Sequence, residues 1–157
     1  MSQNLFRWMS QSALHDWVIS SPFIWPTLES IHFVSLCVLA GSLLVVDLRL
    51  IGFFRQPCAS MTALLIRLAL AAFAVNLATG VLFFFGNTFK YVNNPAFELK
   101  MILILVAGAN ALLFRLHLRQ IVESDRVSVT SAGVGYLSLA LWAGVIICGR
   151  MITFYAP

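Results

Sequence analysis

Four long apolar stretches constrain this chain more than any other feature of its sequence. They run over about residues 25–54, 61–85, 97–118 and 135–155. Each reaches the roughly 20 residues that an α-helix needs to cross a hydrocarbon core about 30 Å thick. Because lipid offers the backbone no hydrogen-bond partner, a stretch of this kind crosses a membrane as a helix. The pattern therefore predicts an all-α membrane protein with four spans.

The composition and the placement of charge support the same class. Hydrophobic residues make up 61% of the chain and charged residues only 10%, with a mean hydropathy of +0.92. In a soluble domain roughly a quarter of all residues are charged. The net charge is +4, but the basic residues stand at the ends of the apolar stretches, which is typical of membrane orientation and not of a nucleic-acid partner. We expect a polytopic membrane four-helix bundle in a lipid bilayer.

The first 24 residues differ from the four stretches. Apolar residues recur there at helical spacing, and polar residues lie elsewhere around the helix; the apolar ones are Leu5, Trp8, Met9, Ala13 and Trp17. This pattern predicts an amphipathic helix that lies in the membrane interface. The expected organisation is an interfacial helix over residues 1–24, followed by the four-helix bundle over residues 25–157.

Basic residues are distributed unevenly over the two sides of the expected bundle. Six of the ten lie in or beside the links after the first and third spans, and four lie on the other side. Cytoplasmic loops carry the excess of Lys and Arg, so both links are expected in the cytoplasm and both termini outside. In a bacterial cell this places the protein in the inner (plasma) membrane with periplasmic termini.

Ionisable side chains inside the spans are the candidates for function, because each is costly in lipid. Glu29 and His32 stand three residues apart at the start of the first span and share one side of its helix. Lys100 lies one turn into the third span, and Arg150 lies near the end of the fourth. With both termini outside, all four belong to an outer pocket. Trp142, two turns before Arg150, is expected to line the same space.

Histidine is the most common metal ligand and exchanges protons near neutral pH. His32 is therefore the expected metal ligand or proton-handling group of the outer pocket. His15, on the expected interfacial helix, is the histidine on the same side that can join it at one metal. The two cations of the pocket can neutralise the carboxylates of an anionic ligand such as a porphyrin. They can equally pair with Glu29 and Glu98 in a purely structural network.

A second set of polar residues stands at the cytoplasmic ends of the spans. Its unusual member is Asp47, because basic residues, and not acids, orient a protein in the membrane. The other members are three arginines, Arg49, Arg67 and Arg115. Arginines at such a boundary typically reach out of the lipid toward water. We expect a structural ion network here, in which an arginine partner makes the burial of Asp47 tolerable.

Several of these residues form a pattern that resembles a known family. Glu29 and His32 begin the pattern E-x-x-H … G-S … D-L-R-L-L-G. The matching runs that follow are Gly-Ser at 41–42, DLRLIG at 47–52, TGVLF at 79–83 and FELK at 97–100. Over about residues 25–113 the chain thus resembles a family of small bacterial four-helix membrane proteins. The resemblance implies the fold and brings no function.

More distantly, the chain is similar to HemJ-type protoporphyrinogen oxidases and to the membrane domain of CopD-type copper proteins. The similar features are an early histidine, the Ala40-Gly41 pair and a lysine that opens the third span. The resemblance to the HemJ type implies bound haem b and functional roles for the histidine and the lysine, whose places His32 and Lys100 occupy. The chain departs from that pattern at Asn110, where a histidine is expected.

Three hypotheses follow for the outer pocket. The first is a membrane redox protein that binds haem b or a porphyrin, with His32 as axial ligand, Glu29 orienting it, and Lys100 and Arg150 holding the propionates. The second is copper or small-cation handling. The third is a non-enzymatic membrane subunit or scaffold, whose polar groups form an interhelical network. Common enzyme motifs are absent from the sequence, and the sequence does not decide whether the protein is an enzyme. The possible protein partners are a second copy of the chain, in a homo-oligomer, or a membrane redox protein.

Cysteine labelling in intact cells tests the orientation. In a variant without the three native cysteines, Ser2→Cys should react with a membrane-impermeant maleimide, because the N-terminus is expected outside. Ser128→Cys, in the link after the third span, should react only after the cells are permeabilised. The reverse pattern would show that the protein is inserted the other way round.

Overall fold

Helices account for nearly all of the backbone that the structure describes. The computed structural model describes residues 2–53, 59–124 and 129–155, and the side chains of residues 2, 3, 5, 59, 115–124, 129 and 130 lie outside this description. The helices in these ranges are α1 (Ser2–Ser10), α2 (Ala13–Ile19), α3 (Ile24–Ile51), α4 (Ala59–Gly86), α5 (Thr88–Val92), α6 (Pro95–Ser124) and α7 (Val129–Met151). The same ranges contain no strand. The all-α class is confirmed.

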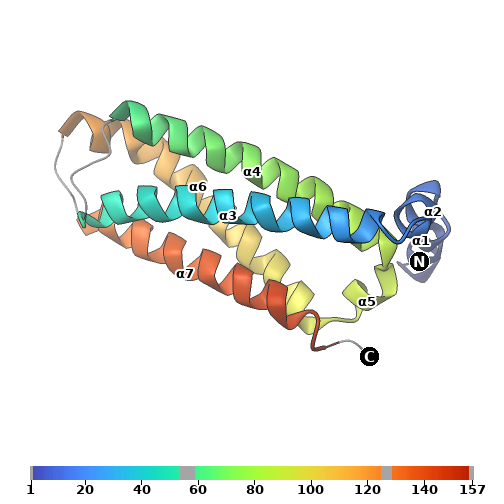
Figure 1. Ribbon diagram of the computed structural model, residues 1–157. Coiled ribbons are helices and arrows are strands. Elements are labelled where there is room, and N and C mark those ends of the chain that lie inside the picture. Colours follow the sequence, from blue (N-terminus) through green and yellow to red (C-terminus); the bar gives the residue numbers. More distant parts are fainter. Residues whose placement is uncertain (1, 54–58, 125–128, 156–157) are drawn as a thin grey trace.

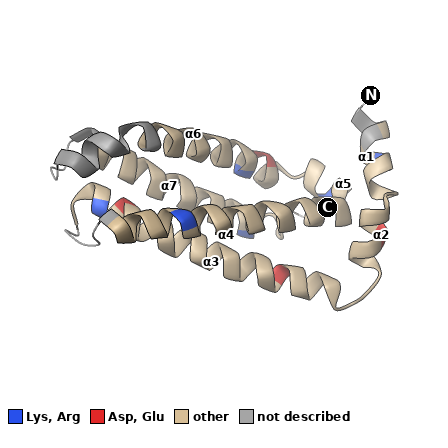
Figure 2. Ribbon diagram, turned by 90° about the horizontal axis from the view of Figure 1, so that it is seen from above, with Lys and Arg blue, Asp and Glu red and all other residues tan. Residues whose placement is uncertain are grey.

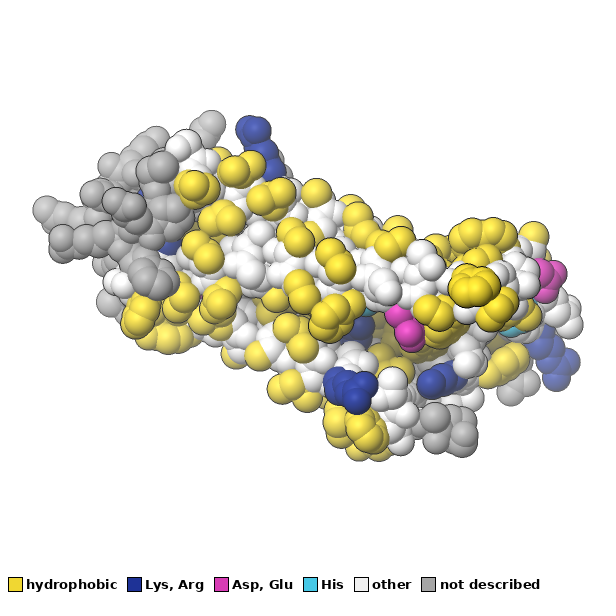
Figure 3. Space-filling model, in the orientation of Figure 1, with side chains coloured by type: hydrophobic (Ala, Val, Ile, Leu, Met, Phe, Trp, Pro, Cys, Tyr) yellow, Lys and Arg dark blue, Asp and Glu magenta, His cyan; other side chains and the backbone are white. Residues whose placement is uncertain are grey.

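Four of the described helices are long and apolar enough to cross a membrane. They provide the candidate spans Ile24–Ile51, Ser60–Gly86, Pro95–Phe114 and Ser131–Met151, whose bounds lie within a few residues of the predicted ones. Phe33, Leu105 and Ile147 are among many large apolar side chains exposed on these helices, and Figure 3 shows hydrophobic side chains spread along the visible flank. Apolar surface of this extent needs lipid around it, so the chain is a multi-pass integral membrane protein.

Helix α3 lies between α4 and α7, and α6 packs against α7 (Figure 1). Within the described ranges α4 and α6 make no comparable contact. The bundle therefore consists of two packed pairs, α3/α4 and α6/α7, which α3 and α7 join. A small apolar core lies at this junction, made of Leu39, Ala69 and Ala72 with Leu36, Leu43, Phe73 and Trp142 packed against it.

The two ends of the bundle differ. In Figure 1, α3 and α6 end and α4 and α7 begin at one end, which we call the link end. Helices α1, α2 and α5 and the end of α7 lie at the other, which we call the terminal end. The start and the finish of the chain thus lie on one side of the bundle, as expected. That this side is periplasmic stays a prediction.

At the link end, α3 is stopped by a glycine. Gly52 adopts the left-handed conformation with φ of 86°, which glycine enters at little steric cost. Its N–H donates to the carbonyl of Arg49, and the N–H of Phe53 donates to that of Leu48. This pair of hydrogen bonds is the Schellman motif, which satisfies carbonyls that the helix end leaves free. It places Asp47 and Arg49 in the last turns of α3.

At the terminal end, Asn94 joins α6 to α7. Its side chain has 0% exposure. Oδ1 accepts hydrogen bonds from the N–H groups of Ala96 (3.0 Å) and Phe97 (3.3 Å), which caps the start of α6. Nδ2 donates to the carbonyl of Ile152 at the end of α7, 3.0 Å away. One buried amide thus fixes two helix ends against each other.

The N-terminal segment forms two short helices where a single one was expected. The hydroxyl of Ser12 accepts a hydrogen bond from the N–H of His15 (3.3 Å) and so begins α2 as its N-cap. Helix α2 packs on α4, where a Cβ at Gly86 would come within 2.8 Å of Val18 and Trp25. The missing side chain of Gly86 is what allows this approach. The interfacial location of α1 and α2 stays a prediction.

Replacing Asn94 should weaken the α6/α7 pair. Asn94→Ala removes an N-cap and leaves the buried carbonyl of Ile152 without its donor, so we expect the free energy of unfolding in detergent micelles to fall by about 2–3 kcal/mol. Asn94→Ser keeps a capping oxygen but loses the amide, and should cost about half as much. An unfolding free energy of Asn94→Ala equal to that of the wild type would contradict the role of this side chain.

Candidate functional site

Thr79 holds the ring of His32 at the α3/α4 interface. The Thr79 hydroxyl donates its one proton to the carbonyl of Val75, 2.8 Å away. Nδ1 of His32 lies 2.6 Å from Oγ1. With the hydroxyl proton on a backbone carbonyl, Oγ1 accepts the Nδ1–H, which assigns the proton of the imidazole to Nδ1. A neutral imidazole with a proton on Nδ1 has an unprotonated Nε2. No described residue forms a hydrogen bond with this Nε2, so it is available as a ligand or as a proton acceptor.

Glu29 does not orient His32, which corrects the expectation from the sequence. Its Oε1 accepts a hydrogen bond from Nε1 of Trp25 (2.9 Å), and its side chain is exposed. The ring of His32 instead meets the edge of Phe83 at 5.4 Å between centroids. Phe83 in turn contacts the ring of Trp25 at 5.2 Å. Helical spacing places Glu29 and His32 on the same side of α3, but Trp25, one turn earlier, takes the carboxylate.

Lys100 places a positive charge in the terminal half of the bundle. Its side chain is half-buried, and a Cβ at Gly149 would lie 3.5 Å from its Nζ. The ammonium interacts electrostatically with His32, and also with the buried thiol of Cys148. In the described part of the chain no carboxylate pairs with it. Lys100 therefore lies by Gly149 of α7 within electrostatic range of His32, and its charge has no described counter-ion.

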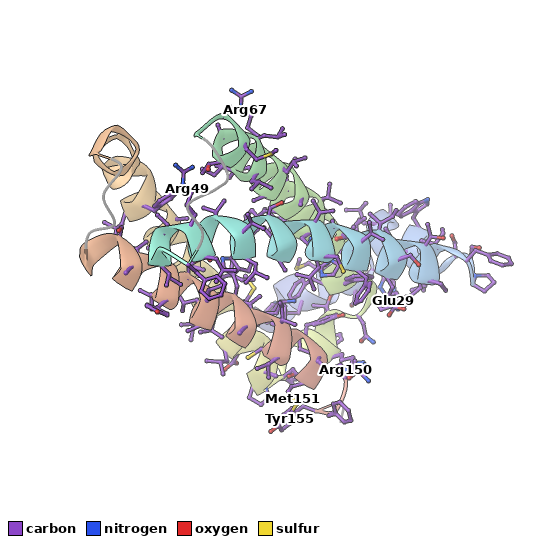
Figure 4. All side chains as sticks on the ribbon, turned by 60° about the vertical axis from the view of Figure 1, so that its left-hand side comes forward. Glu29, Arg49, Arg67, Arg150, Met151 and Tyr155 are labelled. Atoms are coloured by element: carbon purple, nitrogen blue, oxygen red, sulfur yellow. The ribbon has the colours of Figure 1, made fainter. Side chains whose placement is uncertain are left out.

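The other members of the predicted outer pocket lie elsewhere. Arg150 is exposed, and its guanidinium stacks on Phe154 with 5.5 Å to the ring centroid (Figure 4). Trp142 packs edge-on against Phe73 at 6.2 Å, in the apolar core at the middle of the bundle. Among the described residues, neither side chain forms a hydrogen bond or a ring contact with His32 or Lys100. Sequence position indicated the depth of these side chains but not the direction in which they extend.

His15 and His32 are held at different places on α4. Nδ1 of His15 donates to the carbonyl of Phe85, 2.9 Å away, whereas His32 is held by Thr79. Six residues of helix separate the two anchoring positions by about 9 Å. Among the described residues, no three His, Cys, Asp or Glu side chains lie together in a group that could hold a metal ion. The structure thus does not bring the two histidines together as a metal site.

Sequence reasoning missed two features of the terminal half. Asn76 donates through Nδ2 to the hydroxyl of Ser35 (2.7 Å), one turn from the His32–Thr79 bond. Three rings, Phe84, Tyr91 and Phe97, meet at 5.3–6.3 Å between α4, α5 and α6. Burial raises the pKa of Tyr91, and Glu29 acts in the same direction. The sequence does contain a signal for the Asn76–Ser35 contact, since Asn76 and Thr79 are polar residues three positions apart within an apolar stretch.

At the link end, the expected ion network has a different arrangement. Asp47 is 3% exposed and forms a side-chain hydrogen bond with Ser138 of α7. Arg49 donates instead to the hydroxyl of Thr62. Arg67 is exposed and extends away from α4 (Figure 4). The side chain of Arg115 lies outside the described residues. In the described parts of the four long helices, Figure 2 shows charged positions only sparsely distributed.

Comparisons with known proteins find no match to this chain, whether with family models, with curated proteins or with solved structures. The resemblance to the small bacterial family, and the more distant ones to HemJ-type and CopD-type proteins, stay predictions. The case for a function therefore depends on the geometry of the site.

Removing the acceptor of His32 should destabilise the α3/α4 pair. Thr79→Val preserves the shape of the side chain but leaves Nδ1–H without its partner, so we expect the free energy of unfolding to fall by about 1–3 kcal/mol. Thr79→Ser keeps the hydroxyl and loses one methyl group, at a cost of about 0.8 kcal/mol. Denaturant titration of both variants in micelles measures the difference. Equal stabilities would argue against the hydrogen bond.

Proposed function

We propose that the terminal half of the bundle binds an anionic, flat aromatic cofactor, haem b or a porphyrin, for a redox role in the membrane. The observation that carries the proposal is a free imidazole nitrogen within electrostatic range of an unpaired ammonium. Lys100 lies close enough to His32 to act on it electrostatically, and neither Nε2 of His32 nor Nζ of Lys100 has a hydrogen-bond partner among the described residues.

Lys100 accounts for the anionic character of the ligand. A charge that is partly removed from water and has no counter-ion is costly, and a cation inside a span is costly for the same reason. The two acids nearest in sequence, Glu29 and Glu98, are both exposed. A carboxylate that the ligand brings would supply the missing partner of Lys100 through a charge-assisted hydrogen bond. A porphyrin propionate is such a group.

His32 accounts for the metal. A neutral imidazole binds a metal through its unprotonated nitrogen, and the Nδ1–H bond to Thr79 is the kind of contact that orients such ligands. The rings of Phe83 and Trp25 on the same side provide apolar, aromatic surroundings. Bound haem would supply one-electron chemistry at this place. His32 would hold and orient it, and Lys100 would pair with its carboxylate. Arg150, which is exposed, is not part of the site.

The two alternatives fit the geometry less well. Copper or another small cation needs several ligands, and the described residues offer no group of three. A scaffold role explains the bonds between Asn76 and Ser35 and between Thr79 and His32 as interhelical contacts. The scaffold role does not explain why Lys100 carries a charge without a described counter-ion.

The optical spectrum of the purified full-length protein tests the proposal. Protein from cells supplied with iron and 5-aminolevulinate should show a Soret band, and His32→Ala should lose it. Lys100→Gln should keep the band and retain haem about tenfold more weakly, because one charge-assisted hydrogen bond contributes about 1.5 kcal/mol or more.

His15→Ala and Glu29→Gln are the matched controls, because both side chains are hydrogen-bonded elsewhere. Both variants should keep the band at the wild-type intensity. Wild-type protein without a Soret band, even after reconstitution with haem, would refute the proposal. If His32→Ala and Lys100→Gln then change only stability, the scaffold role is the better account.

A further inference from the structure

The carboxyl group of Asp47 is enclosed at the α3/α7 contact in the link half of the bundle, apart from the site proposed above. Its side chain is 3% exposed. A Cβ at Gly135 of α7 would lie 3.0 Å from the carbonyl oxygen of Asp47 and 3.0 Å from the side chain of Ile51. The two helices therefore approach each other closely at a glycine. Asp47 is therefore buried at the contact between α3 and α7.

Asp47 has one described hydrogen-bond partner, and that partner is neutral. Ser138 bonds to the carboxyl group, while Oδ2 is buried and has no hydrogen-bond partner. The described charged and titratable groups on the packed helices either have other partners or are exposed. Arg49 of α3 donates to Thr62. Arg67 of α4 and Tyr136 of α7 are exposed, and the side chains of Arg115, His117 and Arg119 on α6 lie outside the described residues.

An ionised carboxylate in such surroundings is costly, because both lipid and the apolar interior leave its charge unsolvated. Binding a proton at Oδ2 removes the charge and needs no further cation. We propose that Asp47 is a proton-binding site inside the membrane, which holds a proton at neutral pH and exchanges it through the link end. The apolar core around Leu39, Ala69 and Ala72 separates it from His32, so the proposal is independent of haem binding.

Labelling with dicyclohexylcarbodiimide tests this directly. The reagent adds to a protonated carboxyl group in an apolar environment and leaves a stable N-acylurea, with no group lost. At pH 7 only about 1 in 500 ordinary glutamates carries a proton. The full-length protein in liposomes should therefore be modified at Asp47 at least about tenfold more than at exposed Glu29 and Glu98. Peptide mass spectrometry measures all three sites in one sample.

Two variants and one change of salt sharpen the test. Asp47→Asn should lose the adduct and keep the fold, since an amide has a similar shape. Ser138→Ala removes the described hydrogen-bond partner of the carboxylate, so labelling should persist to a higher pH than in the wild type. Labelling of Asp47 no greater than that of Glu29 and Glu98 across pH 5–8 would overturn the proposal. So would protection of Asp47 by sodium but not by potassium chloride, which would make it a sodium site.

Discussion

Lipid gives no hydrogen bonds, and the architecture of this protein follows from that constraint. Each backbone polar group inside the membrane must be satisfied within its own helix, which leaves α-helices as the form of the four spans. Polar side chains on those helices need partners on a neighbouring helix. Asn94 at the terminal end is the clearest case, because one buried amide satisfies the start of α6 and the end of α7 together.

The same constraint explains what joins the helices into pairs. Apolar side chains gain little by leaving lipid for another apolar surface, so packing, close backbone approach and polar contacts decide the arrangement. Between α3 and α4 those contacts are His32 with Thr79 and Ser35 with Asn76. Between α3 and α7 the close approach occurs at Gly135. The pairs thus depend on a few positions along otherwise uniform helices.

Among the described residues, two ionisable groups remain that packing does not explain, and they lie on opposite sides of the apolar core. In the terminal half, Lys100 lacks a described counter-ion and acts electrostatically on His32, whose Nε2 has no described hydrogen-bond partner. In the link half, Asp47 lacks a described cation and has one oxygen without a partner. Their needs differ, because an unpaired ammonium attracts an anionic ligand, whereas an unpaired carboxylate in lipid is neutralised most simply by a proton.

The sequence by itself determined the number of spans, their helical form and the return of the chain to its starting side, because apolar length and lipid chemistry permit no other outcome. It also indicated that His32, Lys100 and Asp47 are exceptional. Only the tertiary structure decided their partners: Thr79 in place of Glu29 for His32, and Ser138 in place of an arginine for Asp47. The reason is that helices apolar on all sides carry no amphipathic stripe that marks an inward face. The direction of each polar side chain is therefore set by which helix lies beside it.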